Sequence, residues 1–237
     1  YTQDYADHSP YLTRFRGKQT AFLPPVELPK PAQGAVEAFA RAHDLGQRRP
    51  VIGMAARFAA EKGVEVLLDA LPRVLETHPR AQVLFAGQYQ DVLGEQAYAD
   101  RLLPRIQAYE RDGHWKFLGV LPPQEMAAFF PNLDVLVVPS LNSTEAFGLV
   151  QVEAMMNNVP CIASALPGVR RPVQMHGMGE VVPIGGAAAL GEALLKVLGN
   201  RPGYHCDTAA LAAQYDPDTV AQEYERLFAR LKAGTKA

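Results

Sequence analysis

Two carboxylates are the first residues of this sequence whose types and spacing could do chemistry. Glu145 and Glu153 lie eight positions apart, one just before and one inside a stretch with helical periodicity. Eight residues of α-helix span about 12 Å, whereas the paired carboxyl groups of glycoside-hydrolysing sites lie about 5 to 9.5 Å apart. The spacing therefore disfavours an acid and a base acting on one bond, and it suits an extended ligand with hydroxyl-rich ends.

The segment between the two acids predicts an anion site at a helix end. Phe147 and Gly148 stand at the start of the helix, where the first backbone amides have no partner within the helix and the helix dipole is positive. Gly148 also allows a ligand to approach the backbone closely, because glycine has no side chain. We therefore expect a phosphate group to bind at this end of the helix.

Glu153 occupies an unusual place in the same helix. It lies on the stripe of Leu149, Val152 and Met156, which the periodicity directs towards the core. A buried carboxylate is destabilising unless it gains partners. Two explanations are open: contact with a ligand, or a salt bridge within the core, with Glu145 acting only as a helix cap. We favour the ligand because a second set of charged residues is expected at the same crevice.

Arg57 and Lys62 form that second set. Arg57 follows the expected strand at residues 51–55, and Lys62 stands at the mouth of the expected helix at residues 64–76. A lysine there opposes the positive end of the helix dipole unless an anion binds nearby. The pair can also be an ordinary surface feature, with the side chains bonded to Glu61 or Glu65. Taken alone, the segment fits both interpretations equally.

The elements that must position these residues follow from the pattern of apolar residues. After residue 32, short apolar runs bounded by Gly or Pro alternate with stretches of helical periodicity. The expected strands are residues 51–55, 82–86, 115–118, 134–138, 159–163 and 180–182, and the expected helices between them are residues 64–76, 96–110, 124–130, 147–157 and 187–198. This alternation predicts an α/β fold with a doubly wound, parallel, six-stranded, Rossmann-like sheet. With the common strand order 3-2-1-4-5-6, ligands bind at the loops after residues 55 and 138.

The two ends of the chain are expected to lie outside this sheet. Residues 1–31 should comprise a short helix, with Ser9 as its N-cap and Pro10 as its first residue, followed by a proline-rich extended linker. Residues 32–215 form the sheet domain, which ends in a helix near residues 207–215. Residues 216–237 form a separate final helix.

Composition limits which partners and which cellular compartment we expect. The 237 residues carry a formal net charge of −2 with acids and bases interspersed, which predicts no nucleic-acid partner. Cys161 and Cys206 lie far apart in the sequence, which predicts neither a disulfide framework nor a zinc site and favours a cytoplasmic protein. No apolar run reaches the roughly 18 residues that cross a bilayer. Membrane contact, if any, is expected to be peripheral.

Several motifs together resemble the nucleotide-sugar-binding half of glycosyltransferase family 4 (group 1), a family of retaining enzymes with the two-domain GT-B fold. The motifs are "RFAAEKG" with Arg57 and Lys62, the acid-seven-acid spacing of Glu145 and Glu153 around "FG", and the segments "FLGVLPPQEM", "VPS" and "VPCIASALPG". The resemblance covers nearly all of residues 20–200. Residues 1–31 are similar to the end of the family's amino-terminal acceptor domain and its linker.

The resemblance implies a role for each of these residues. Arg57 and Lys62 would bind the diphosphate of a nucleotide-sugar donor and stabilise the departing nucleoside diphosphate, and Glu145 would contact the donor sugar near its reacting face. Glu153 would hydrogen-bond the ribose hydroxyls. The other implied donor contacts are the backbone amides of Phe147, Gly148 and Leu149, and the base-binding positions Val120 and Met126. Neither a metal ion nor a cofactor is implied.

The implied function is transfer of a hexose from a nucleoside-diphosphate sugar to a glycan or lipid-linked acceptor. In the family the acceptor domain precedes the linker, and almost none of it is present in this chain. We therefore expect donor binding with little or no transfer by the chain alone. Two alternatives are a catalytically silent nucleotide-sugar-binding module and a GT-B-fold sugar-nucleotide epimerase. The donor base, the sugar, the acceptor and the oligomeric state do not follow from the sequence.

Overall fold

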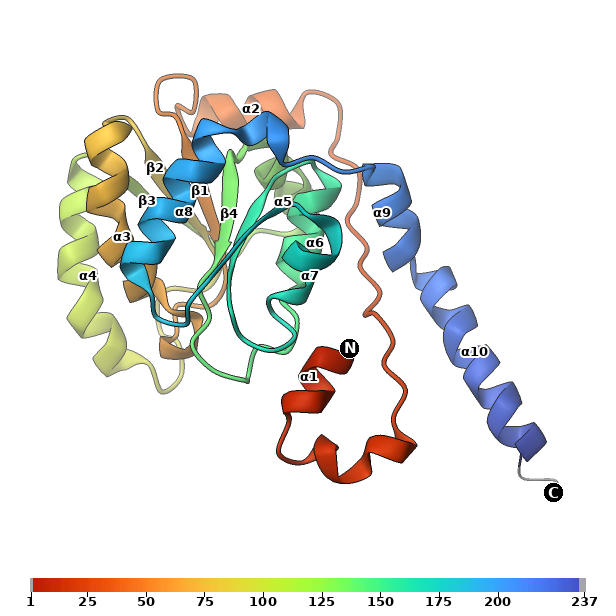
Figure 1. Cartoon of the computed structure of the whole chain (residues 1–237). Coiled ribbons are helices and arrows are strands. Elements are labelled where there is room, and N and C mark those ends of the chain that lie inside the picture. Colours follow the sequence, from red (N-terminus) through yellow and green to blue (C-terminus); the bar gives the residue numbers. More distant parts are fainter. Residues whose placement is uncertain (1, 235–237) are drawn as a thin grey trace.

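The structure, a computed structural model, describes residues 2–234, and these residues form a six-stranded, all-parallel sheet (Figure 1). The strands are β1 (Val51–Ala55), β2 (Gln82–Ala86), β3 (Trp115–Gly119), β4 (Val135–Val138), β5 (Cys161–Ser164) and β6 (Gly179–Val182). Their spatial order is β3-β2-β1-β4-β5-β6. The predicted α/β class, the strand number and the strand order are confirmed.

Successive strand residues face opposite sides of the sheet and belong to two separate cores. Val51 and Leu84 pack in one core, whereas Ile52 and Val83, their neighbours in the chain, pack in the other. The period of two in a strand produces this division. Because both faces are covered, the strands are almost continuously apolar, as buried parallel strands require.

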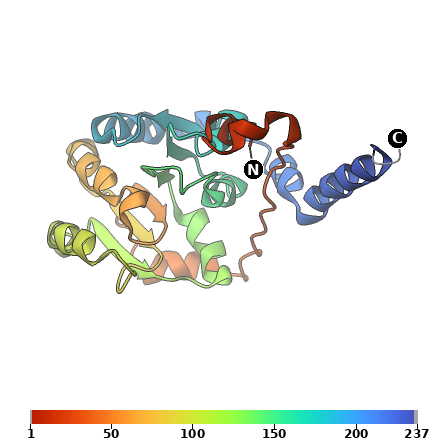
Figure 2. The same cartoon turned by 90° about the horizontal axis from the view of Figure 1, so that it is seen from below.

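Helices cover both faces of the sheet, as the view from below shows (Figure 2). One core is completed by α3 (Val64–Thr77), α4 (Gln96–Arg111) and α8 (Ala187–Gly199). The other core is completed by α2 (Ala35–Ala42), α5 (Pro123–Phe129), α6 (Leu149–Met156), α7 (Arg171–His176) and α9 (Thr208–Tyr215). The last helix, α10 (Pro217–Gly234), projects away from the sheet (Figures 1 and 2). Within residues 2–234, no helix is long and apolar enough to cross a membrane.

Two of these helices were not predicted, and one begins later than predicted. The helices α2 and α7 are short, with eight and six residues, and helical periodicity is read over windows of about 11 to 18 residues. Helix α6 begins at Leu149 rather than at residue 147. Its N-cap, Gly148, has a left-handed backbone with φ of 77°, which sets the start of the helix.

The prediction of one helix beginning at Ser9 and Pro10 is wrong. The segment forms two short helices, α1 (Gln3–His8) and the 3-10 helix η1 (Leu12–Lys18). Pro10 disfavours helical backbone at the residue before it, and Ser9 is extended, with φ of −81° and ψ of 124°. Ser9 therefore ends α1, whereas Thr2 caps its start by accepting a hydrogen bond from the Tyr5 amide at 3.1 Å.

The segment between η1 and α2 has no helix or strand from residue 19 to residue 32. It is nevertheless tied to the sheet domain, because Val26 is buried and its amide donates to the Tyr215 carbonyl oxygen at 2.9 Å. At the far end of the chain, the Asp216 side chain accepts from the Thr219 amide at 3.0 Å and caps α10. Residues 19–32 and α10 thus lie on the same side of the sheet domain (Figure 1).

Candidate functional site

A cavity of about 290 Å³ lies beyond the carboxyl ends of β1 and β4, where the strand order reverses. This is the position at which open α/β sheets bind ligands. The lining residues come from the two predicted loops and the start of α6: Met54–Arg57, Lys62, Val137–Ser140, Glu145 and Gly148–Val150. The structure therefore brings Arg57, Lys62, Glu145 and the α6 amino end to one cavity.

Two left-handed glycines shape the walls of this cavity. Gly63 is the N-cap of α3 with φ of 67°, and a Cβ atom there would lie 2.2 Å from the Pro139 carbonyl oxygen. Gly148 is the N-cap of α6, and a Cβ atom there would lie 2.7 Å from Nε2 of Gln151. Only glycine fits both the backbone conformation and the available space at these two positions. Helix α6 therefore begins against the cavity, and neither α6 nor α3 has a side-chain cap at its first amides.

Lys62 and Glu145 form an ion pair across the cavity. Lys62 Nζ lies 2.8 Å from Glu145 Oε2, and the two side chains are only 18% and 21% exposed. Glu145 Oε1 has no partner among the described residues. Glu145 does not cap α6, because the N-cap residue is Gly148. The pair places a cation and a free carboxylate oxygen beside the α6 amino end.

Arg57 forms an ion pair with Glu61, which is the surface alternative that the sequence left open. Its guanidinium lies 2.9 Å from Glu61 Oε1, and its side chain is 60% exposed. An exposed ion pair of this kind contributes about 0 to 1 kcal/mol. An anion in the cavity could therefore draw Arg57 away from Glu61 at little energetic cost.

Glu153 is half-buried, and its carboxylate has no partner among the described residues. Its carboxylate makes no hydrogen bond or ion pair to any residue in the described range 2–234, and burial raises the pKa of the Glu153 carboxyl. The alternative of a core salt bridge is therefore wrong. An unpaired carboxylate at reduced solvent exposure is destabilising. A group of this kind is a candidate for ligand contact.

Two details of α6 differ from the prediction. Leu149 does not face the core: it is 41% exposed and lines the cavity, because it is the first helical residue. Phe147 is buried, and its ring centroid lies 6.2 Å from that of Tyr215, so only its backbone can reach a ligand. Val152 is buried as expected, and Met156 is half-buried.

The two predicted base-binding positions lie outside this cavity. Val120 follows β3, which β2 separates from β1, and its side chain is 74% exposed. Met126 lies in α5, half-buried against the core on the α6 side of the sheet. Their contact with a nucleotide base stays a prediction.

Gln151 is a site residue that sequence reasoning missed. It is completely buried, and its side-chain Nε2 donates to the carbonyl oxygens of Phe147 and Val169, each at 2.9 Å. These bonds fix the turn into α6 against the loop after β5. The signal in the sequence was a polar residue on the buried face of an otherwise apolar helix.

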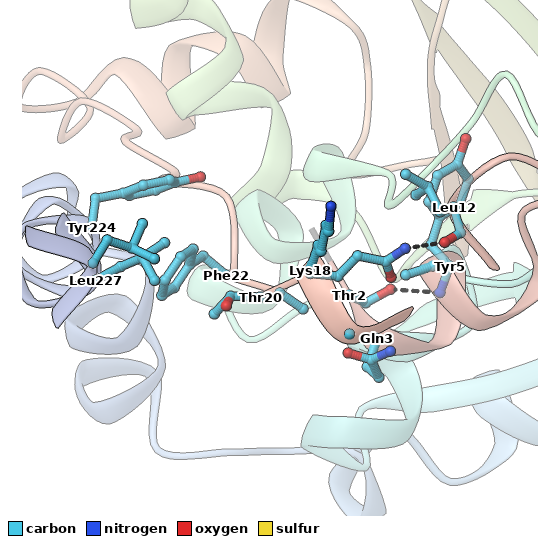
Figure 3. A pocket seen from close by; sticks show the side chains of 14 residues that line it. Thr2, Gln3, Tyr5, Leu12, Lys18, Thr20, Phe22, Tyr224 and Leu227 are labelled. Carbon is cyan, nitrogen blue, oxygen red and sulfur yellow. Dashed lines mark hydrogen bonds between the residues drawn. The ribbon is translucent and has the colours of Figure 1, made fainter. Parts of the chain in front are cut away.

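A larger cavity of about 650 Å³ lies elsewhere, between the first 22 residues and α10 (Figure 3). Phe22 stacks there near Tyr224, with ring centroids 4.6 Å apart, and Leu227 lies beside them. Of the described residues that line it, Lys18 alone is charged. The cavity has volume without converging charged groups, so we place the candidate site at the smaller cavity.

Metal-ligating residues do not cluster at either cavity. Across residues 2–234, no group of three or more His, Cys, Asp or Glu side chains is placed to hold a metal ion. Cys161 and Cys206 are both free. Among the described residues, the charged side chains that line the smaller cavity are those of Arg57, Lys62 and Glu145.

The fold and the cavity together define a doubly wound α/β domain whose candidate ligand site lies at the switch point of the sheet. Residues 36–215 match the family described as "Glycosyl transferases group 1". The chain belongs to this family, and its sheet is the Rossmann-like half of the GT-B fold.

Known proteins support this assignment. The phosphatidyl-myo-inositol mannosyltransferase of Mycobacterium leprae is 35% identical over 170 residues, which are 70% of this chain and 42% of the relative. Sucrose-phosphate synthase from Thermosynechococcus elongatus has a TM-score of 0.77 and 26% identity, over 94% of this chain and 56% of its own. Anabaena HepE, solved in complex with UDP-glucose, has a TM-score of 0.71 and 22% identity, over 85% of this chain and 54% of its own. The chain spans about half the length of the curated relatives it matches.

Replacing Glu153 with glutamine should stabilise the protein at neutral pH. Because the folded pKa of Glu153 is raised above its ordinary value of 4.5, the folded state holds this proton more tightly than the unfolded state does. Stability is then lost as pH rises from about 4.5 through the folded pKa. Glu153→Gln removes this loss, and we expect a gain of about 0.5 to 1 kcal/mol at pH 7.5 that vanishes at pH 4.

Urea denaturation at the two pH values measures this difference. The exposed Glu225 on α10 provides a matched control, because Glu225→Gln removes an acid of the same type from the surface. Equal unfolding free energies for the parent protein and Glu153→Gln at pH 7.5 would show that the carboxylate is not destabilising.

Proposed function

We propose that this chain is the donor-binding half of a retaining glycosyltransferase that transfers a hexose from a nucleoside-diphosphate sugar to a glycan or lipid-linked acceptor. The observation that carries the proposal is the Lys62–Glu145 ion pair, 2.8 Å long, facing the amino end of α6. A cation and free amides attract a diphosphate, and a carboxylate beside them can accept hydrogen bonds from a sugar. Membership of the glycosyl transferase family supports the same conclusion.

The diphosphate would rest on the amino end of α6. The amides of Gly148, Leu149 and Val150 have no partner within the helix, and the helix dipole adds to their attraction for an anion. Lys62 is held beside them by Glu145, and Arg57 can leave Glu61 to reach the same anion. The site thus offers both fixed and movable positive groups.

The positive groups of the site would act most strongly while the sugar–phosphate bond of the donor breaks. As the bond between the sugar's anomeric carbon and the phosphate oxygen breaks, negative charge builds up on the departing nucleoside diphosphate. Lys62, Arg57 and the α6 amides stabilise that charge, and donors fixed before the reaction do so without reorganising. The acceptor hydroxyl oxygen bonds to the anomeric carbon as the sugar–phosphate bond breaks, and its proton passes to the departing phosphate oxygen.

The two acids would grip the two ends of the donor. Glu145 presents its free Oε1 to the hydroxyls of the hexose while Oε2 holds Lys62. Glu153 lies inside α6 and would gain its lacking partners from the ribose hydroxyls. Val120 and Met126 would bind the base, with Val120 contributing through its backbone. This assignment accounts for an otherwise unpaired, half-buried carboxylate at Glu153.

Transfer would also depend on an acceptor, which this chain would not bind by itself. The acceptor would bind to a domain that precedes the linker, so this chain alone would bind the donor and transfer the sugar slowly or not at all. The reaction would need no metal ion and no cofactor. The free thiols of Cys161 and Cys206 suit the cytoplasm. Membrane contact would be peripheral and would serve a lipid-linked acceptor.

Calorimetric titration tests the donor site directly. The ligands are UDP, GDP and ADP, each alone and as its glucose and mannose conjugate. We expect one nucleotide family to bind with a dissociation constant in the micromolar range, corresponding to about −8 kcal/mol at 1 μM. Absence of binding by every nucleotide at millimolar concentration would refute the donor site.

Turnover assays separate the possible activities. Transfer that appears only when a separately expressed amino-terminal domain is added supports the proposed enzyme. Binding with no turnover under those conditions would favour a silent binding module. Conversion of the donor to its epimer without any acceptor would favour the epimerase.

A further inference from the structure

Helix α1 contacts both loops that flank the start of α6. The Tyr5 hydroxyl donates to the Ser143 carbonyl oxygen at 3.4 Å, in the loop between β4 and α6. Asp4, its neighbour, bonds to the loop between β5 and α7. In Figure 1, α1 lies next to the loops at the carboxyl edge of the sheet. The first helix is therefore docked beside the candidate site, although more than 130 residues separate the partners in sequence.

Asp4 makes the tightest of these contacts. One carboxylate oxygen accepts from the Gly168 amide at 2.8 Å and from Arg170 Nε at 3.0 Å, and the other accepts from an Arg170 terminal nitrogen at 2.5 Å. Burial raises the pKa of the Asp4 carboxyl, but the bonds from Arg170 and Gly168 outweigh it and hold the pKa below its usual value. The carboxylate thus bonds mainly to one loop, and its other ionic contact is His8 of the same helix, with Nδ1 3.5 Å from Asp4 Oδ1.

That loop in turn touches the residues that lead into α6. A Cβ atom at Gly168 would lie 2.1 Å from the Ala146 carbonyl oxygen, so the two backbones are in close contact. The neighbouring Val169 carbonyl accepts from the Gln151 side chain, which also holds the Phe147 carbonyl. A continuous path of contacts therefore runs from Asp4 through residues 168–169 to the turn at residues 146–148.

We infer that Asp4 is a positioning residue that sets the amino end of α6 for the donor diphosphate. The inference rests on the proposed function for the donor, but the contacts themselves do not. Asp4 is not among the residues that line the cavity. It acts through the Gly168 amide and Arg170, which fix the loop that Gln151 ties to α6.

Thermodynamic linkage adds a second consequence. If docking of α1 strengthens donor binding by some factor, then donor binding must strengthen docking of α1 by the same factor. A change in the docking of α1 would thus change donor affinity, and donor binding would change the docking of α1. A bound nucleotide should slow amide exchange in α1, for example at Ala6, whose amide bonds to the Thr2 carbonyl at 3.2 Å.

Amide hydrogen exchange tests the positioning role without requiring a ligand. The reporters are the Gln151 amide, bonded to the Gly148 carbonyl at 3.0 Å, and the Arg171 amide, bonded to the Gly168 carbonyl at 3.1 Å. The Val83 amide, bonded to the His114 carbonyl at 2.8 Å, reports global opening. We expect Asp4→Ala to speed exchange of the two reporters roughly tenfold relative to Val83.

Three further variants give the test its controls. Asp7→Ala removes an acid from the same helix whose partner is the exposed Gln3 side chain, and it should change neither reporter. Arg170→Gln removes the charged half of the contact, together with the Arg170 bond to the Ala165 carbonyl oxygen at 3.3 Å, and offers a second route should Asp4→Ala fold poorly. Asp4→Asn keeps an acceptor for the Gly168 amide and should retain part of the protection.

Nucleotide affinity provides the second readout. Asp4→Ala should weaken the nucleotide that binds best among UDP, GDP and ADP roughly tenfold, whereas Asp7→Ala should not. Equal acceleration of all amides, unchanged reporters, or unchanged affinity of a binding-competent parent would each overturn the positioning role. If the parent protein binds no nucleotide, the proposed function fails, and the exchange result alone decides whether Asp4 positions α6.

Discussion

Lys62→Met should weaken nucleoside diphosphate binding by about 30-fold or more. Lys62 is the mostly buried cation of the candidate site, and its ammonium group would donate charge-assisted hydrogen bonds to the diphosphate. Such bonds contribute about 1.5 to 3 kcal/mol, and each 1.4 kcal/mol corresponds to about tenfold in affinity. Methionine keeps the apolar stem and removes only the charge. Calorimetric titration of the best-binding nucleotide measures the loss.

The control for Lys62→Met is Lys196→Met. Lys196 also pairs with a glutamate, Glu180, at 2.7 Å, but its side chain is exposed and lies far from the cavity lining. It should leave affinity unchanged. If both variants bind nucleotide as tightly as the parent protein, the diphosphate does not rest beside Lys62.

Gly63→Ala should destabilise the folded protein by about 3 kcal/mol. A side chain in left-handed backbone costs about 1 to 2 kcal/mol, and Gly63 has φ of 67°. The new Cβ atom would also meet the Pro139 carbonyl oxygen at 2.2 Å, and relieving such overpacking costs about 1 to 3 kcal/mol. For a chain of this size the melting temperature should fall by roughly 6 to 12 °C. Thermal unfolding followed by circular dichroism measures it.

Gly34→Ala separates the cost of backbone strain from the cost of overpacking. Gly34 is the N-cap of α2 with φ of 74°, so the backbone strain is similar, but a Cβ atom there meets nothing within 4 Å. Its cost should be about 1 kcal/mol. Equal melting temperatures for the two variants would show that α3 and the loop after β4 are not packed as tightly as the structure indicates. Gly63→Ala should also weaken nucleotide binding, since Lys62 precedes it directly.

The sheet was predictable because each of its elements is specified locally. The apolar runs near residues 51–55 and 82–86 are bounded by Gly or Pro and alternate with helical periodicity, and these features need no knowledge of distant residues. Parallel strands joined by helices have few arrangements, and the common order assumed from the sequence is the one that the structure has. The helices α2 and α7 were missed because six to eight residues are shorter than the windows of about 11 to 18 residues over which helical periodicity is read.

The candidate site was predictable only in part. Residues that follow directly on β1 and β4 had to meet at one edge of the sheet, and Arg57, Lys62 and Glu145 do line one cavity. Leu149 was assigned to the core from the periodicity of α6, yet it is the first helical residue and faces the cavity. Periodicity assigns a face to the body of a helix but does not describe its first turn.

The sequence by itself determined the fold class and the number of strands and, with the common strand order assumed, the edge of the sheet where charged residues collect, because periodicity and chain direction are local properties. Only the tertiary structure decided which charges pair. It joined Lys62 to Glu145, left Glu153 without a partner and bonded Asp4 to a loop 164 residues away. The physical reason is that an ion pair depends on distances between loops, and these are set by how the helices pack on the sheet and by where glycines such as Gly63 allow close approach.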